Sequence, residues 1–193
     1  MHHIYHTEGI ILSSKNYGEA GKYYAIFTRD LGMINASAQG VRKISSKLRF
    51  VLQDFSYIKL DLVQGKDFWR LTSASKTNKL DDIAKGHVSF EIFSNISRLL
   101  KRLLTGEYPN STLFADLIEG LHFLEKAKTY DEAQNIEVII VLRILNNLGY
   151  LGSNEALKNI TKSPYEDSLI FEAGQRRTKI LQEINKAIHE TNL

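Results

Sequence analysis

Hydrophobic and polar positions alternate along the first part of the chain. Between residues 4 and 74, five segments are rich in β-branched and aromatic residues, and Ile58, Leu60 and Leu62 recur at a period of two. Short turn sequences at residues 28–32 and 64–67 can join antiparallel neighbours. The pattern predicts five strands, at residues 4–14, 22–28, 33–39, 55–63 and 68–74.

Five strands in this length of chain is typical of a small barrel. The longest interval without a strand pattern, residues 40–53, falls between the third and fourth predicted strands. An OB fold, which is a five-stranded, partly open Greek-key barrel, carries its linking segment at that place. We therefore predict an OB-fold nucleic-acid-binding domain in residues 1–79.

After residue 79 the apolar positions recur at spacings of three and four, which is typical of amphipathic helices. Asp81 or Asp82 is the predicted N-cap of a first helix that ends at Gly106. Residues 109–111 open a second helix, with apolar positions from residue 113 to residue 124 on one side. These two helices begin a predicted all-α domain, residues 80–193, so the fold class is a β barrel followed by a helical bundle.

The predicted helical domain continues with a helix that is apolar nearly all round. Asp131 is its expected N-cap and Gly149 its C-terminal stop. Because residues 138–148 have no polar face, we expect this helix at the centre of the bundle. Residues 152–174 are mixed and polar, with a proline at 164, so we predict a loop there before a last helix through residues 179–188.

Positive charge is concentrated in the predicted barrel. The chain carries 25 Lys and Arg against 22 Asp and Glu, a net charge of +3. Residues 1–79 hold twelve of the basic and six of the acidic residues, whereas residues 80–193 hold thirteen and sixteen. A polyanionic partner would therefore meet the N-terminal domain.

A stretch without any acidic residue runs from Leu31 to Gln53. Most charge runs are solvated surface loops, but an acid-free run of this length cannot neutralise its own cations. We therefore predict that its four cations bind an anion such as the sugar-phosphate chain of a nucleic acid. With the other cations of the barrel, the candidate nucleic-acid-binding residues are Arg42, Lys43, Lys47, Arg49, Lys22, Arg29, Lys15 and Arg70.

Exposed aromatic rings beside these cations would add base stacking to phosphate contacts. Candidates for that role are Tyr17, Tyr23, Tyr57 and Trp69, although Tyr57 can equally cover a strand face. Aromatic residues of strands more often pack in the interior. On that ground we expect core positions for Tyr24, Phe27, Phe55 and Phe68.

The sequence offers no catalytic or metal-binding pattern. It has no cysteine, which removes thiol nucleophiles and thiolate zinc sites, and His2, His3 and His6 have no acidic residue at ligand spacing. We expect no enzymatic activity, no metal and no cofactor. Apolar runs fall short of the roughly 18 residues that span a bilayer, and no signal-peptide pattern stands at the start, so we expect a cytoplasmic protein without membrane contact.

Six short motifs, in order, resemble the N-terminal domain of the bacterial recombination mediator RecO family. They are EGIIL, YGEAG, FTRDLG, QGVRK, LQDF and WRLTSA. Weaker matches follow in NSTLFADLIEGLHFLE and RILNNLGYL, so the resemblance covers about residues 4–152. By position, Arg42 and Lys43 match the basic loop of the family, which makes them the first candidates for DNA contact, followed by Lys47 and Arg49.

The resemblance implies a function as well as a fold. Members of the family bind single- and double-stranded DNA, anneal complementary strands and, with RecR and single-strand-binding protein, help to load RecA, without catalysing a covalent reaction. The expected partners are therefore DNA, RecR, the C-terminal tail of single-strand-binding protein and, indirectly, RecA, at the nucleoid. The pocket for that tail needs a basic residue beside apolar ones, and Arg143 is a candidate without a matching family position.

This sequence departs from the family pattern in its last part. Many members carry a four-cysteine zinc module after the LGY-type helix end, whereas this chain has no cysteine, so the resemblance implies a member without zinc. The C-terminal part is also shorter. Two alternatives stay open at this point: an RNA-binding OB-fold protein, and a protein–protein adaptor whose basic loop docks on an acidic partner.

Overall fold

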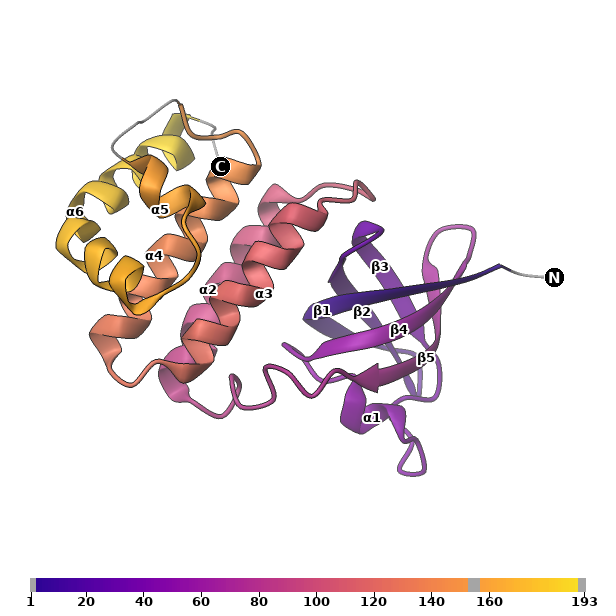
Figure 1. Cartoon of the computed structure of the whole chain (residues 1–193). Helices are drawn as coiled ribbons and strands as arrows, with labels where there is room; N and C mark the ends of the chain where they lie inside the picture. Colours follow the sequence, from indigo (N-terminus) through magenta and orange to yellow (C-terminus); the bar gives the residue numbers. More distant parts are fainter. Residues whose placement is uncertain (1–2, 153–156, 191–193) are drawn as a thin grey trace. The chain divides into compact units, whose positions relative to one another are not determined.

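The computed structural model describes residues 3–152 and 157–190. Its N-terminal part is a closed five-stranded barrel in which the strands follow the order β1-β2-β3-β5-β4 (Figure 1). The strands are β1 (Ile4–Tyr17), β2 (Gly21–Thr28), β3 (Gly32–Ala38), β4 (Tyr57–Gln64) and β5 (Trp69–Lys76). The OB-type barrel predicted from the sequence is confirmed.

The long first strand closes the barrel because it pairs on both edges. Its first half, from Ile4 to Ile10, pairs antiparallel with β4, and the part from Gly9 to Tyr17 pairs antiparallel with β2. The register of the β1–β2 pairing shifts between Ile11 and Ser13, just after the pairing with β4 ends at Ile10. Such an irregularity bends a strand, which is what a small barrel requires. A short parallel pairing between β3 and β5 completes the ring.

Inward-facing residues at every second position fill the barrel. Trp69 lies opposite Ala36 in the β3–β5 pairing, and the small alanine leaves room for the indole ring in the interior. Beta-branched and leucine side chains surround this pair. The buried members of the strands in this core are Ile11, Tyr24, Ile26, Ile34, Ala36, Ala38, Ile58, Leu60, Leu62, Trp69 and Leu71.

Six helices complete the described fold. They are α1 (Leu48–Val51), α2 (His87–Leu103), α3 (Ser111–Lys126), α4 (Tyr130–Asn147), α5 (Lys158–Lys162) and α6 (Asp167–Glu190). Contacts divide the chain into two compact units. The barrel unit reaches Asp81 and includes Ser97–Ser111, and the helical unit holds Asp82–Ile96 and the chain from Thr112 onward.

Two predicted helix starts differ from the observed ones. The first long helix begins at His87 and not at Asp81 or Asp82. Leu80 has a φ of 60°, which a helix cannot accept, and the Asp82 amide donates to the Glu125 carboxylate at 2.8 Å. In α4 the N-cap is Thr129 and not Asp131, because the Thr129 hydroxyl accepts the Glu132 amide at 3.1 Å.

The predicted loop at residues 152–174 is wrong in two places, since it contains the short helix α5 (Lys158–Lys162) and the start of α6. Helix α6 starts at Asp167 and runs through Gly174 for 24 residues. Its buried positions continue the spacing of the later ones, from Leu169 and Ala173 to Ile180 and Ile184. Gly174 is not a break but a point of close approach, since a Cβ there would lie 2.6 Å from the Asn135 amide nitrogen.

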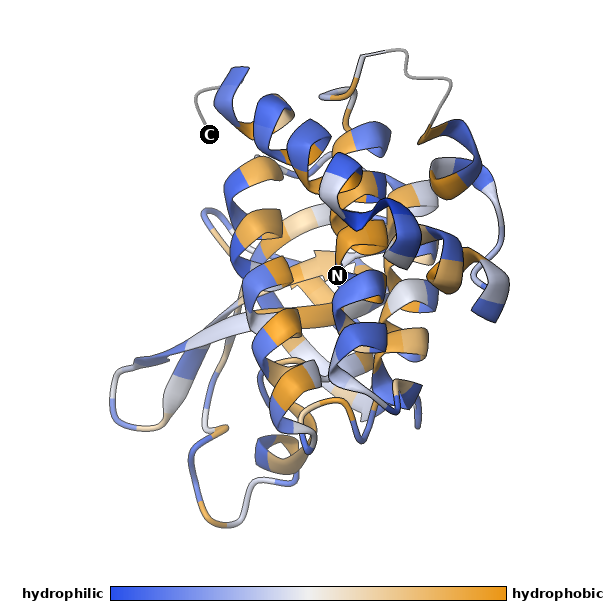
Figure 2. Cartoon of the chain, turned by 90° about the vertical axis from the view of Figure 1, so that its left-hand side faces the viewer, coloured by the Kyte–Doolittle hydropathy of each residue, from blue (hydrophilic) through white to orange (hydrophobic). Residues whose placement is uncertain are grey.

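Helix α4 forms the centre of the helical unit, as its apolar sequence predicts. It contacts both α5 and α6, and its buried residues lie on several sides of the helix. In Figure 2 the helices show orange apolar residues along one side and blue hydrophilic residues along the other. Burial of these apolar stripes is the main favourable contribution to folding of such a unit.

Gly120 of α3 lies at a tightly packed point of the helical unit. A Cβ at this position of α3 would lie 2.6 Å from Ile140 Cγ1 and 2.6 Å from the Tyr165 hydroxyl. We expect Gly120→Val to lower the free energy of unfolding by about 2 kcal/mol, because overpacking forces neighbours apart. Urea unfolding measures this change. Gly152→Val is the matched control, since no atom of the described residues lies within 4 Å of a Cβ there, and an equal loss in both variants would contradict the tight packing.

Candidate nucleic-acid interface

The segment of residues 38–50, here called the basic loop, is fixed to the barrel by buried residues near both of its ends. Val41 is 2% exposed, and Leu52, just after the loop, is 1% exposed, and both belong to the barrel core. The Arg42 amide donates to the Ala20 carbonyl at 2.9 Å, which ties the loop to the turn between β1 and β2. Helix α1 then leads into β4. The residues between these anchors are therefore held at the surface.

The four cations of the basic loop carry unneutralised charge. Arg42, Lys43 and Lys47 are exposed and Arg49 is half-buried. Within residues 3–152 and 157–190, none of the four forms an ion pair with a carboxylate. The Arg42 guanidinium donates to the Gly18 carbonyl at 3.3 Å, and that of Arg49 lies 4.6 Å from the centre of the Phe50 ring. An anion can therefore approach all four.

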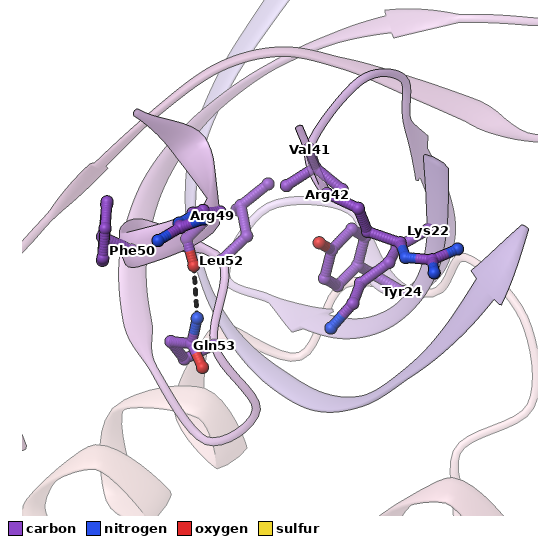
Figure 3. A pocket seen from close by; sticks show the side chains of 8 residues that line it. All are labelled: Lys22, Tyr24, Val41, Arg42, Arg49, Phe50, Leu52 and Gln53. Carbon is purple, nitrogen blue, oxygen red and sulfur yellow. Dashed lines mark hydrogen bonds between the residues drawn. The ribbon is translucent and has the colours of Figure 1, made fainter. Parts of the chain in front are cut away.

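Three cations line a pocket at the mouth of the barrel, with a volume of about 310 Å³. Figure 3 shows Lys22 and Arg42 on one side of it and Arg49 on the other. The Tyr24 hydroxyl, which has no hydrogen-bond partner among the residues that the structure describes, belongs to the same lining. Burial raises the pKa of Tyr24, and the charge of Asp54 raises it further, so the phenol remains a neutral donor. An anionic group in this pocket would meet cations and one free donor.

The other four predicted cations lie at three different places on the barrel. Lys22 lines the mouth pocket, and its Nζ donates to Ser14 Oγ at 3.3 Å. Lys15 and Arg70 are exposed on the outer face of the barrel. Arg29 follows the far end of β2, roughly 23 Å from the basic loop at the usual rise of a strand. It pairs with Glu8 at 2.9 Å, so the structure does not bring it to the site.

The aromatic predictions are partly wrong. Trp69 is 4% exposed, and its Nε1–H donates to the Glu107 carboxylate at 2.8 Å. Tyr57 is also buried and donates to Glu8 at 2.6 Å, and burial together with this bond raises its pKa. Phe68, expected in the core, is 45% exposed. Phe68 stands just before β5, whereas Trp69 is its first residue and faces the core beside the small Ala36 of the adjacent strand β3, which leaves room for the indole ring.

Arg143 lies inside the helical unit and is 3% exposed. Its guanidinium donates to Asp116 at 2.7 Å and to the carbonyls of Ile160 and Ser163. The same group lies 4.2 Å from the centre of the Tyr165 ring. These contacts join α3 and α4 to the segment around α5. The predicted contact of Arg143 with a partner protein has no support from this position.

The described residues show neither a metal site nor a membrane span. Across residues 3–152 and 157–190, no group of three or more His, Asp or Glu side chains is arranged to hold a metal ion. In the same ranges, no helix has the length and apolar character needed to cross a bilayer.

Family models match both parts of the chain. A model described as the N-terminal domain of recombination protein O matches residues 1–79, and one described as its C-terminal domain matches residues 92–151. The chain belongs to the RecO family. The resemblance carried by the short sequence motifs is thereby confirmed.

Individual RecO proteins are similar over the same region. A protein named DNA repair protein RecO from Heliobacterium modesticaldum is 30% identical over 147 residues, which cover 76% of this chain and 52% of the relative. Its namesake from Thermodesulfovibrio yellowstonii is 30% identical over 148 residues, or 76% of this chain and 58% of the relative. The chain thus spans about half the length of the curated relatives it matches.

The internal role of Arg143 leads to a prediction about stability. We expect Arg143→Met to lower the free energy of unfolding by about 3 kcal/mol, because Asp116 and two carbonyls lose a buried partner. The free energy of unfolding of Arg143→Lys should lie between those of Arg143→Met and the unmodified chain. A lysine ammonium cannot donate to all three acceptors in the geometry of the planar guanidinium. Urea unfolding of the full chain measures both.

An exposed ion pair provides the control for Arg143. Lys186 pairs with Glu190 at 4.0 Å on the surface of α6, where such a pair contributes at most about 0.5 kcal/mol. The Lys186→Met variant should therefore have almost the same free energy of unfolding as the unmodified chain. If Arg143→Met also unfolded like the unmodified chain, the structural role of Arg143 would be refuted.

Proposed function

We propose that this RecO-family chain is a non-catalytic DNA-binding protein of repair and recombination, and that the basic loop is its contact with the sugar-phosphate backbone. The single observation that carries the proposal is that four cations, Arg42, Lys43, Lys47 and Arg49, have no carboxylate partner in the part of the chain that the structure describes. Family membership supports DNA as the polyanion. Because phosphate contacts carry no base information, sequence specificity should be low.

Annealing of complementary strands follows from the same charges. Two single strands repel one another through their phosphates, and bound cations lower this repulsion. The basic loop and the mouth pocket offer cations from one end of the barrel, with Lys22 beside Arg42 and Arg49. A protein that neutralises phosphates of both strands without reading bases would let them pair. We propose that single- and double-stranded DNA are both bound.

The family resemblance also supports a set of protein partners. We propose that the chain acts with RecR and with the tail of single-strand-binding protein and so helps to load RecA. Since Arg143 is committed to Asp116 inside the helical unit, the pocket for that tail has to use other cations. No step of this function makes or breaks a covalent bond, so we propose that the protein is not an enzyme.

Salt dependence of DNA binding tests the role of the basic loop. Four phosphate contacts to a single strand predict a slope of log K against log salt of about −3, and roughly fifty-fold weaker binding when salt rises from ~50 to ~200 mM. Replacing Arg42, Lys43, Lys47 and Arg49 by Gln should remove most of this slope. Fluorescence anisotropy with a mixed-sequence single strand at rising salt measures it.

A variant with the same change in net charge is the control. Lys126, Lys128, Lys162 and Lys179 are exposed in the helical unit, and their replacement by Gln should leave the slope nearly unchanged. An equal loss in both variants would assign binding to overall charge and refute the proposal. Tighter binding of RNA than of DNA of equal length would indicate an RNA-binding OB-fold protein that contacts the 2′-hydroxyl group. An acidic protein partner that DNA cannot displace would indicate an adaptor.

A further inference from the structure

A row of outward-facing side chains crosses four strands of the barrel. Lys15 of β1 lies opposite Tyr23 of β2, Tyr23 lies opposite Ser37 of β3, and Ser37 lies beside Arg70 of β5. Directly paired residues share one face of a sheet. Their neighbours Tyr24, Ala36 and Trp69 fill the core, so the row faces outward. Lys15 and Arg70, its two ends, are exposed.

Three aromatic rings form a continuous strip on this outer face. The rings of Tyr17 and Tyr23 lie 4.4 Å apart between centroids, and those of Tyr23 and Phe68 lie 5.0 Å apart. Tyr17 is 54% exposed and Phe68 is 45% exposed, so the two outer rings leave much of their surface to solvent. Single exposed aromatics are common, but contiguous ones on a folded protein mark a binding surface.

Two turns place the outer rings of the strip. Tyr17 ends β1 just before the turn to β2, and Phe68 stands just before β5 after the turn from β4. Glycine at 65 is required there, since a Cβ would collide with the Phe68 carbonyl oxygen, while its amide donates to that oxygen at 3.1 Å. In OB folds the loops β1–β2 and β4–β5, together with the face of strands 2 and 3, are where oligonucleotides bind.

We propose that the strip of Tyr17, Tyr23 and Phe68 is a stacking platform for the bases of single-stranded DNA. The inference rests on the proposed function and adds to it how the protein distinguishes a single strand from a duplex. Bases of a duplex are already stacked and hide their faces, whereas unpaired bases offer them to aromatic rings. The strip therefore selects unpaired strands, while the basic loop holds phosphates of either form.

Charge around the strip supports a nucleic acid as its occupant. Lys15 and Arg70 border the rings on two strands, and the basic loop is bonded to the turn that follows Tyr17 through Arg42 and the carbonyls of Gly18 and Ala20. In a single-stranded nucleic acid, the phosphates can contact these cations while the flat bases stack on the neighbouring rings. Cross-strand packing alone would hold Tyr23, but it does not require two outer rings with about half of their surface exposed.

A double-mutant cycle between protein rings and DNA bases tests the platform. The probe is a single strand of about 12 nucleotides, within the site size of one OB fold, compared with the same strand carrying abasic sites throughout its centre. We expect Tyr17→Ala with Phe68→Ala to weaken binding of the intact strand at least about five-fold. The same double variant should bind the abasic strand and a duplex as the unmodified protein does, with an unchanged salt slope.

Two further variants separate stacking from stability. Phe68→Trp should retain binding of the intact strand, whereas Phe68→Leu, which keeps an apolar side chain, should weaken it. Phe171→Ala removes an exposed ring of the same type from α6 and should leave binding unchanged. Thermal unfolding of each variant confirms that the barrel remains folded under the binding conditions.

The outcomes distinguish the platform from the proposed function on which it rests. If the double variant binds the intact strand as tightly as the unmodified protein while the salt slope persists, the platform is refuted and phosphate binding stands. An equal loss for intact and abasic strands also refutes it, because the rings would then act on something other than bases. If the unmodified protein shows no salt-dependent binding of DNA, both the stacking platform and the proposed function are refuted.

Discussion

The whole interface depends on burial of Val41 and Leu52 in the barrel core. These two apolar residues fix the chain near both ends of a cation-rich segment, and the bond from the Arg42 amide to Ala20 fixes its position against the β1–β2 turn. The cations between the anchors then have no route into the interior and no carboxylate partner among the described residues. Repulsion among them would be relieved when an anion binds, so the hydrophobic anchors keep the cations where the proposed phosphate contacts need them.

In the proposed function, affinity and selectivity are divided between two sets of residues on one barrel. Phosphate contacts at the basic loop act on any nucleic acid and weaken with salt, because each contact releases counterions. Ring contacts at Tyr17, Tyr23 and Phe68 do not involve charge and require unpaired bases. A protein that anneals strands has to release its product. Loss of the ring contacts when bases pair would lower affinity for the duplex while leaving the phosphate contacts in place.

Most of the fold could be predicted from the sequence. Apolar residues recur at every second position in the strands and at every third or fourth position in the helices, and this spacing shows which side of each element is buried. Details set by a contact distant in sequence could not. The inward choice of Trp69 over Phe68 depends on Ala36 in another strand, and the start of α2 depends on the bond from Asp82 to Glu125. The basic loop could be found because an acid-free run is a property of the sequence itself. Which cations share a pocket depends on how the barrel closes, so the sequence alone does not separate Arg29 from the cations of the basic loop.

Arg143 shows why a lone cation in an apolar helix does not identify a binding site. Its neighbours in α4 are apolar, and the same sequence pattern fits a partner pocket or an internal hydrogen-bond centre. The two differ in where the acceptors lie, and here Asp116 and two carbonyls of the α5 segment supply them. A buried guanidinium has to be saturated, because an unpaired charge in the interior costs several kcal/mol. The cations of the basic loop differ from Arg143 because they face solvent and have no carboxylate partner among the described residues, so an anion from outside the chain can reach them.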